Sequence, residues 1–180
     1  MQSLPGLTKI VRKIHVLADT PLQSADFLAA CESVSWPLHP ETYEGERREF
    51  MQFKVRLSAV NELFLSVNLA DDFITCALLP FFFWEDYDVE DYESEALYLK
   101  ARRAFDRRFE QALAQAVKVL GPPQRRWIEG ETQFQKAVWR IGNCLLALQQ
   151  DDSDTQFGFD LNFLLQPCPE PLRERPNLVI

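Results

Sequence analysis

The fold of this chain is decided by residues 156–166, which read QFGFDLNFLLQ. Successive side chains of a strand point to opposite faces of a sheet, so this alternation predicts a strand with one buried face. The predicted buried set is Phe157, Phe159, Leu161, Phe163 and Leu165, and the other face carries Gly158, Asp160 and Asn162.

The residues before this strand complete an antiparallel meander. Apolar runs at 134–141 and 144–149 flank Gly142 and Asn143, a pair that favours a tight hairpin turn. The stretch Asp151-Asp152-Ser153-Asp154 is typical of a second turn. Because such short connections join antiparallel neighbours, residues 134–166 predict three antiparallel strands.

A long amphipathic helix precedes this meander. Apolar residues recur at steps of three and four from Leu97 to Leu120, which predicts a helix over residues 94–120. Ser94 is expected to cap its start, and Gly121 with the two prolines after it is expected to end it.

The first half of the chain has a similar order of elements. Helices are predicted at residues 4–17 and 22–31, followed by a surface loop at 36–48. Three strands are predicted at 53–57, 63–69 and 73–79, the last of them closed by Pro80. A helix and three strands therefore occur twice, and the sequence leaves open whether the halves are a duplication.

These patterns predict an α+β fold in which antiparallel sheet packs against the long helix. A chain of 180 residues with 47% hydrophobic and 26% charged residues is typical of one soluble globular domain. Within this domain, residues 1–180, we expect lobes at 1–83 and 94–167. An acidic connection at 84–93 joins the lobes, and an extended tail at 168–180 is expected to lie over the body.

The net charge of −8 comes from 19 Lys and Arg against 27 Asp and Glu. Seven of the acids lie between Glu85 and Glu95, so the rest of the chain is close to neutral. A nucleic-acid binder and a protein that binds an anionic membrane both need basic surface. The charge therefore argues against nucleic acid and membrane as partners.

No motif indicates catalysis, a cofactor or a metal. The histidines, His15 and His39, lie in no recognisable triad, and the six glycines form no phosphate-binding loop. The four cysteines lack zinc-ligand spacing and are expected to be small buried hydrophobes with reduced thiols. They are Cys31, Cys76, Cys144 and Cys168. With no secretory leader and no spanning segment in the pattern, a cytoplasmic location is expected.

Residues 81–93, which read FFFWEDYDVEDYE, interleave aromatic and acidic side chains. Like charges this dense raise the cost of compaction. In one interpretation Phe81, Phe83, Trp84 and Tyr92 pack inward and the acids face water. In the other, the segment is a recognition surface, where aromatic anchors supply contact area and carboxylates speed encounter with a basic partner.

The anchors of such a surface would be aromatic, and acidic turns elsewhere could extend it. The predicted partner-binding residues are Trp84, Glu85, Asp86, Tyr87, Asp88, Glu90, Asp91, Tyr92 and Glu93, together with Asp71, Asp72, Asp151, Asp152 and Asp154.

Four segments of the last third carry a resemblance to a known class of proteins. They are Leu120-Gly121-Pro122-Pro123, Ala137-Val138-Trp139-Arg140, Leu145-Leu146-Ala147-Leu148-Gln149-Gln150-Asp151 and Phe157-Gly158-Phe159-Asp160-Leu161. In these segments the chain resembles small bacterial immunity proteins of toxin systems. The resemblance implies a non-enzymatic α+β protein that binds a secreted toxin and occludes its active site without a cofactor.

Two alternatives stay open. The order of helices and strands is also similar to that of the small acidic chaperones of bacterial secretion systems, which are usually dimers that hold an extended client segment. An uncharacterised hydrolase that uses Glu or Asp is the other alternative. The sequence favours an inhibitor that binds one basic protein partner, and it leaves open whether the chain is a monomer or a homodimer.

Overall fold

The computed structural model describes residues 6–38, 50–56, 62–84, 93–130, 132–154 and 158–169, with only the backbone at 152–154 and 158. The helices are α1 (Leu7–Ala18), α2 (Ser24–Ser33) and α3 (Glu95–Leu120). The strands are β1 (Phe50–Arg56), β2 (Glu62–Ala70), β3 (Phe73–Trp84), β4 (Arg125–Ile128), β5 (Gln135–Ile141), β6 (Cys144–Asp154) and β7 (Gly158–Pro167). Of the loop predicted at 36–48, residues 39–48 lie outside the described residues, as does the tail beyond residue 169.

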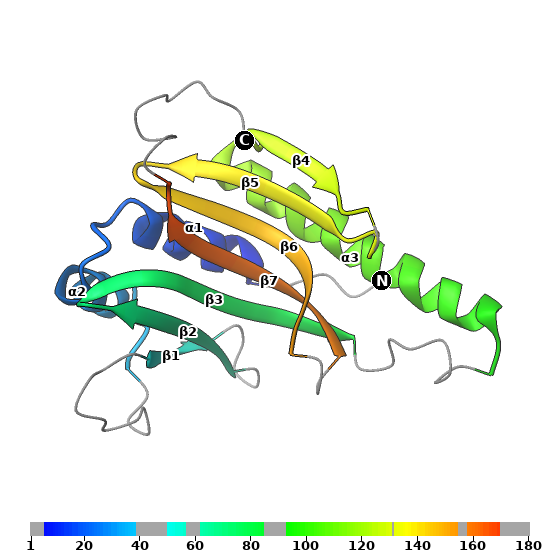
Figure 1. The fold of residues 1–180 in the computed structure, drawn as a ribbon, viewed down its shortest axis with the longest axis horizontal. Helices are drawn as coiled ribbons and strands as arrows, with labels where there is room; N and C mark the ends of the chain where they lie inside the picture. The colour runs from blue at the N-terminus through cyan, green and yellow to red at the C-terminus, as the bar shows by residue number, and fades with distance from the viewer. Residues whose placement is uncertain are drawn as a thin grey trace.

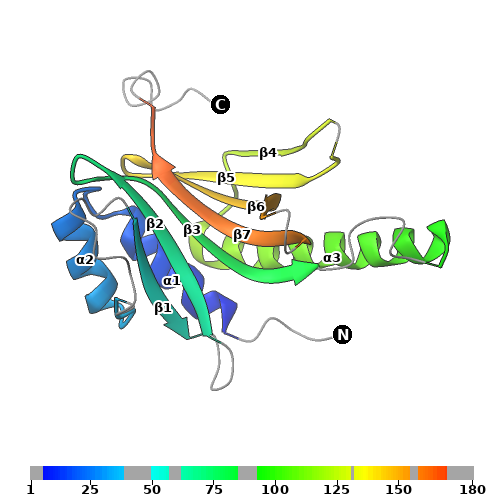
Figure 2. The same cartoon turned by 60° about the horizontal axis from the view of Figure 1, so that its bottom comes forward.

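All seven strands form one antiparallel sheet in the order β1-β2-β3-β7-β6-β5-β4 (Figures 1 and 2). Two meanders, β1–β3 and β4–β7, are joined where β3 pairs with β7. The predicted α+β class is therefore confirmed, with a single sheet shared by both halves. The second meander contains four strands instead of the predicted three. The additional one is the short strand β4, which pairs with β5.

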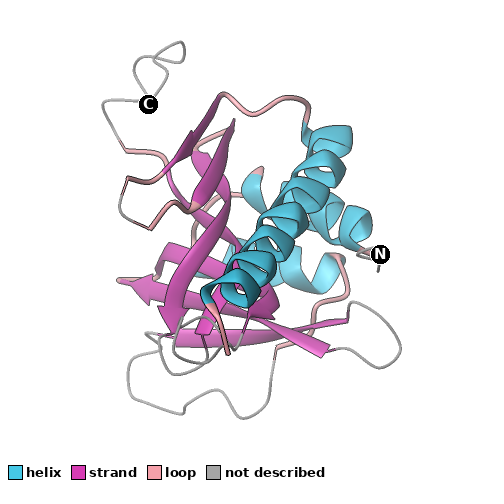
Figure 3. Ribbon diagram, turned by 90° about the vertical axis from the view of Figure 1, so that its right-hand side faces the viewer, coloured by secondary structure: helices cyan, strands magenta, loops and turns pink. Residues whose placement is uncertain are grey.

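The three helices lie on one face of the sheet (Figure 3). Helix α3 begins and ends as predicted. At its start the Ser94 hydroxyl accepts a hydrogen bond from the Leu97 amide at 3.4 Å. Gly121 follows its last residue with φ of +78°, a conformation that favours glycine. The first turns of α3 extend beyond the sheet (Figures 1 and 2).

The sequence predicted that β3 ends at Pro80. The strand instead continues to Trp84. Its pairing with β7 shifts register between Pro80 and Phe82, which is a β-bulge. Proline lacks the N–H that a regular ladder needs, and a bulge tolerates its absence. The bulge lets both Phe81 and Phe82 face the helices, where they stack on Phe163 at 5.2 Å and on Phe105 at 6.2 Å.

Strand β6 also continues further than predicted. Asp151, Asp152 and Asp154 belong to this strand rather than to a turn, because pairing with β7 persists to Asp154 opposite Gly158. The tertiary partner overrides the local turn preference of these residues. The hairpin's tip, residues 155–157, lies outside the described residues.

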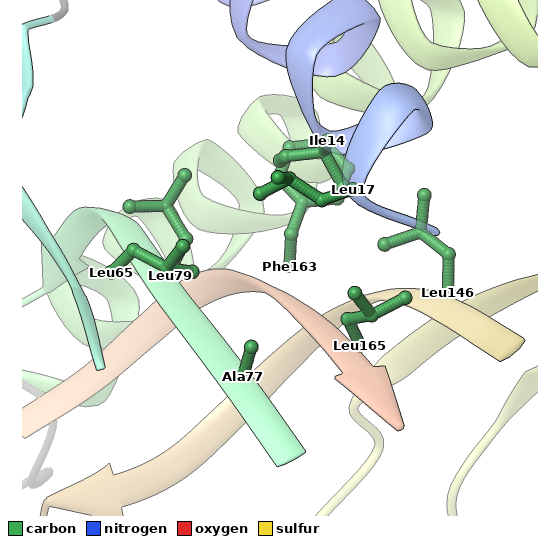
Figure 4. A pocket seen from close by; sticks show the side chains of 8 residues that line it. All are labelled: Ile14, Leu17, Leu65, Ala77, Leu79, Leu146, Phe163 and Leu165. Carbon is green, nitrogen blue, oxygen red and sulfur yellow. The ribbon is translucent and has the colours of Figure 1, made fainter. Parts of the chain in front are cut away.

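The main core lies between the sheet and the helices. β7 contributes Leu161, Phe163 and Leu165 to it, as predicted. Under α1 the packing leaves an apolar cavity of about 10 Å³ (Figure 4), which approaches the minimum space for one water. Its lining side chains are Ile14, Leu17, Leu65, Ala77, Leu79, Leu146, Phe163 and Leu165.

The opposite face of the sheet carries no helix of the described residues, and we call it the helix-free face (Figure 3). Its central part consists of Leu78, Pro80 and Phe83 on β3, Asp160, Asn162 and Leu164 on β7, Leu145, Ala147, Gln149 and Asp151 on β6, Lys136 and Val138 on β5, and Trp127 on β4. The prediction that β7 buries only one side is wrong. Asp160 and Asn162 on the helix-free face are also buried, at 2% and 0% exposure.

A polar network fixes α3 to β6 and to the connection between β4 and β5. The Asp106 carboxylate accepts hydrogen bonds from Arg102 Nε at 3.3 Å and from Gln150 Nε2 at 3.0 Å. Arg102 also donates to the carbonyl oxygens of Thr132 and Gln133. Asp106 therefore binds Gln150 on β6 directly, and it also holds the Arg102 side chain that binds the β4–β5 connection.

We expect Asp106→Ala to lower the free energy of unfolding by about 1–3 kcal/mol, because it removes the acceptor of the Gln150 amide and of Arg102 Nε. The matched change is Glu110→Ala on the same helix, which breaks an exposed ion pair with Arg126 and should cost about 1 kcal/mol or less. Urea unfolding of both variants measures the difference. Equal losses would mean that the Asp106 network adds no more than a surface pair.

All four cysteines are free thiols, as predicted. Cys31, Cys144 and Cys168 are buried, whereas Cys76 is half-buried and its sulfur accepts a hydrogen bond from Asn68. Burial raises the pKa of Cys31 to about 12, since a desolvated thiolate is disfavoured.

The raised pKa predicts a stability that falls at alkaline pH. In the unfolded chain a thiol loses its proton near pH 8.5, whereas folded Cys31 keeps it up to about pH 12. Between these values the unfolded state binds fewer protons, so stability is full below the window and is lost as pH rises through it. Compared with Cys31→Ala, the wild-type unfolding free energy should fall more steeply by about 1.4 kcal/mol per pH unit. Parallel slopes in urea titrations from pH 8 to 11 would contradict this.

Candidate functional site

The described acidic residues among those proposed as partner-binding fall at two opposite ends of the sheet. The turn Asp71-Asp72 precedes the first residue of β3, and Trp84 is the last. The twelve residues of β3 span roughly 36 Å at about 3.3 Å each. Asp151 lies at the Trp84 end, because β7 pairs with both strands there. Residues 85–92, which contain most of the predicted contacts, lie outside the described residues.

The Asp71-Asp72 turn contributes to the architecture at its own end. Both residues have positive φ, 49° and 66°, which aspartate tolerates better than most residues. The Asp72 carbonyl oxygen accepts a hydrogen bond from the Ser24 amide at 2.8 Å, and this bond holds the start of α2. Both side chains are exposed.

Trp84 lies in the core and offers little surface to a partner. It is 9% exposed, and its ring centroid lies 5.4 Å from Phe105, 5.7 Å from Tyr98 and 5.8 Å from Phe159. The contact with Tyr98 places the first turn of α3 beside the end of β3. Glu93 directly precedes the N-cap residue Ser94 and is exposed.

Phe83 is the exposed aromatic residue at this end. Its neighbours Phe81 and Trp84 are buried, as one interpretation of the sequence expected, but Phe83 is 46% exposed on the helix-free face. It lies directly opposite Asp160 on β7, which in turn lies opposite Asp151 on β6. The interpretation in which Phe83 packs inward is therefore wrong for this residue, and Asp160 was not among the predicted site residues. The signal that could have indicated the exposure of Phe83 is Pro80, directly before the aromatic run. A proline within a strand often marks a bulge, and a bulge changes which side chains face the core.

Two amide and two carboxylate side chains form two neighbouring cross-strand pairs between β6 and β7 on the helix-free face. Gln149 lies opposite Asn162, and Asp151 lies opposite Asp160. Asn162 Nδ2 donates to Asp160 Oδ1 at 2.6 Å, and Gln149 Nε2 donates to Asp151 Oδ2. The amide oxygens of Gln149 and Asn162 are buried without a hydrogen-bond donor. We call these four residues with Phe83 the Phe83 corner.

Basic side chains lie on the same face towards the other edge of the sheet. Trp127 on β4 has the Arg125 guanidinium 4.9 Å and the Lys136 ammonium 5.7 Å from its ring centroid. Lys136 lies opposite Gln149, so the basic part of the face borders the Phe83 corner.

The described residues give no metal centre. Among them no three His, Cys, Asp or Glu side chains form a group that could hold an ion. The cavity under α1 has an apolar lining and brings no carboxylates together. In the part of the chain that the structure describes, no helix combines the length and the hydropathy needed to cross a membrane.

Comparisons with known proteins give little. No family model and no curated protein matches the chain. Among solved structures, a DUF4309 family protein of Bacillus subtilis, YjgB, is similar at 14% identity with a TM-score of 0.42. The match covers 93% of this chain and 99% of that one. At this level the likeness carries no argument about function.

The burial of Trp84 and the exposure of Phe83 can be tested by measuring the free energy of unfolding of variants at each position. We expect Trp84→Ala to cost about 3–5 kcal/mol, because it removes a ring packed against three others. Phe83→Ala should cost about 1 kcal/mol or less, since the side chain is half exposed. Urea or thermal unfolding measures both, and a Phe83→Ala loss as large as that of Trp84→Ala would contradict the bulge.

Proposed function

We propose that this chain is a non-enzymatic, cytoplasmic inhibitor that binds one protein partner with a basic surface, in the manner of toxin-system immunity proteins. Its contact surface is the end of the sheet where β3, β6 and β7 meet, together with the acidic connection that leaves Trp84 and returns at Glu93. The observation that supports the proposal best is the exposed Phe83 ring beside Asp160 and Asp151, on the face that no helix of the described residues covers.

The surface has the composition of a protein-binding site. An exposed phenylalanine such as Phe83 supplies apolar area that a partner can desolvate, and aromatic residues often dominate binding energy. Asp151 lies two strands away on the same face, and five acids between Glu85 and Asp91 follow Phe83 closely in the sequence. Such a field speeds encounter with a positive partner and disfavours wrong ones.

The partner should be the product of the gene next to this one, if that gene encodes a protein with a toxic domain. Co-expression of this chain should then restore growth of cells that make the toxin, and the two purified proteins should bind each other. Neutralisation without binding, or no effect of this chain on toxicity, would contradict the proposed function.

Reversal of Glu85, Asp86, Glu90 and Asp91 to Lys should slow association with this partner about tenfold or more at low salt. The reason is that long-range attraction is replaced by repulsion, and the effect should fade as salt is added. Stopped-flow or surface-based kinetics at two salt concentrations measure it, and circular dichroism checks that the fold is intact.

Asp71→Lys with Asp72→Lys is the control for this variant, because these acids lie at the far end of β3. If it slows association as much as the first variant does, net charge rather than the Phe83 end of the sheet governs encounter. If neither variant changes the rate, the acidic connection is a solvated loop.

The alternatives give different results in the same experiments. A secretion chaperone would be a symmetric dimer whose client is disordered when free, which light scattering with and without the client would reveal. A hydrolase would turn over its substrate without forming a stable complex.

A further inference from the structure

We propose that the outer edge of β4 binds an extended acidic segment of another protein, which adds to the sheet as a further strand. The inference goes beyond the proposed function, because this edge is separate from the acidic end of the sheet. Strands β7, β6 and β5 lie between β4 and β3, on which Phe83 lies. At about 4.8 Å per strand, the two surfaces are roughly 19 Å apart across the sheet.

β4 lies at one edge of the sheet, with β5 on one side and no strand of the described residues on the other (Figures 1 and 2). An edge strand presents unpaired N–H and C=O groups with which another chain can pair. At the other edge, the segment before β1 lies alongside that strand. Leu38 forms a bridge with Phe53. The Lys54 amide donates to the Pro37 carbonyl oxygen at 2.9 Å. Among the described residues, β4 is therefore the more open edge.

The hydrogen bonds of the β4–β5 hairpin show which main-chain groups of β4 point outward. The Glu129 amide donates to the Phe134 carbonyl oxygen at 2.8 Å. The amide of the next residue, Gln135, donates to the Gln150 side chain on β6, away from β4. Hydrogen-bonded and non-hydrogen-bonded pairs alternate along antiparallel strands. The amide and carbonyl groups of Ile128, which lies opposite Gln135, therefore point away from β5.

Two residues earlier, Arg126 repeats the orientation of Ile128, so these two residues supply the outward main-chain groups. Their side chains face the helices, where Arg126 is paired with Glu110 on α3 and Ile128 is 57% exposed. Arg125 and Trp127 alternate with them and face the other way. A strand added at this edge would therefore cover apolar area of Ile128 with one set of its side chains and meet Arg125 and Trp127 with the other.

Two cations on the helix-free face of this edge have no carboxylate partner among the described residues. They are Arg125 and Lys136, which lie over the Trp127 ring at 4.9 and 5.7 Å from its centroid. By contrast, Arg102 and Arg126 are each paired with a carboxylate of α3. An acidic side chain of an added strand, next to Trp127 on this face, would lie within reach of both cations. The charge of the edge therefore favours an acidic segment.

Other occupants fit the edge less well. In a continuous antiparallel sheet, a second copy of this chain would place another Arg125 and Lys136 on the same face, where like charges repel. A single-stranded nucleic acid can stack on Trp127, but it has no main-chain amides that pair with β4. An extended peptide with alternating acidic and apolar side chains meets the outward main-chain groups, both cations and Ile128.

The probe is the peptide Ac-Ser-Glu-Val-Glu-Val-Glu-Ser-NH₂, titrated into the isotopically labelled full chain and followed by two-dimensional NMR. Its glutamates match the side of Trp127, and its valines match the side of Ile128. We expect saturable shifts of the backbone amide signals of Arg126 and Ile128 and of the Trp127 indole N–H. The peptide Ac-Ser-Glu-Glu-Val-Val-Glu-Ser-NH₂ has the same composition without the alternation and should bind about fivefold more weakly. Equal binding of both peptides, or shifts located elsewhere, would overturn the proposal.

N-methylated versions of the first peptide test whether its main chain pairs with β4. In antiparallel addition, residues that exchange hydrogen bonds lie directly opposite each other with their side chains on the same face, so the valines pair with Arg126 and Ile128. Methyl groups on the two valine amides should therefore abolish saturable binding. A methyl group on the central glutamate amide, which points to solvent, should leave the affinity unchanged. If both versions bind alike, the peptide is held by charge alone and no strand is added.

A proline in β4 removes the outward donor from the protein's side. Ile128→Pro should abolish peptide binding and leave the pairing with β5 intact, because a proline is tolerated in an edge strand where the N–H faces solvent. Ile128→Ala is the matched control, since it keeps the donor and should weaken binding only about two- to threefold. Circular dichroism checks that both variants are folded. Equal affinities of the two variants would show that the peptide does not pair with this edge.

A charge-reversed pair tests the role of the two cations. Arg125→Glu with Lys136→Glu should weaken binding about tenfold or more, because two ion pairs are replaced by repulsion. Arg103→Glu with Lys118→Glu changes two exposed cations of α3 and gives the same net charge. This control should bind the peptide as the wild type does. Equal weakening by both double variants would mean that net charge, and not the β4 edge, governs binding.

Sedimentation velocity over a range of concentrations tests a second copy as the occupant. A dimer of the wild type that Ile128→Pro turns into a monomer would assign the edge to self-association and overturn the proposal. Short single-stranded DNA that shifts the same NMR signals as strongly as the acidic peptide would also overturn it. None of these measurements needs a toxin, so their failure leaves the proposed function intact. Neutralisation of a toxin by Ile128→Pro as complete as by the wild type is expected, since the two surfaces are separate.

Discussion

The pairing of β3 with β7 is the interaction on which the rest of the structure depends. It joins the β1–β3 meander to the β4–β7 meander and so turns two small sheets into one. The three helices can then share one face, and the core beneath α1 receives side chains from both halves. The same pairing places Phe83 beside Asp160, which makes the exposed ring and the carboxylates neighbours.

A single extra residue in β3 determines which side chains are available to a partner. The bulge at Phe81 changes the alternation, so that Trp84 enters the core and Phe83 faces away from the helices. Because side chains alternate with a period of two, a shift of one residue exchanges the two faces for all that follows. The identity of the surface aromatic therefore depends on how the strand accommodates Pro80.

Local patterns in the sequence predicted the elements well, and distant pairings explain where they failed. The long helix, its Ser94 cap and the burial of Leu161, Phe163 and Leu165 all follow from periodicity within one segment. The continuation of β3 past Pro80 and of β6 through Asp154 depends on β7, which no local window contains. The same applies to the site, since no spacing in the chain relates Phe83 to Asp151 or to the buried amides of Gln149 and Asn162.

The central position of the last strand has a consequence for synthesis and folding. β3 leaves the ribosome long before β7, so its pairing edge stays open until the final strand arrives. An unpaired strand edge rich in aromatic residues is a site for association between copies of a nascent chain. The run of acids between Glu85 and Glu93 follows this strand directly in the sequence, and like charges on two copies repel. Negative charge beside β3 thus opposes aggregation during the interval in which the sheet is incomplete.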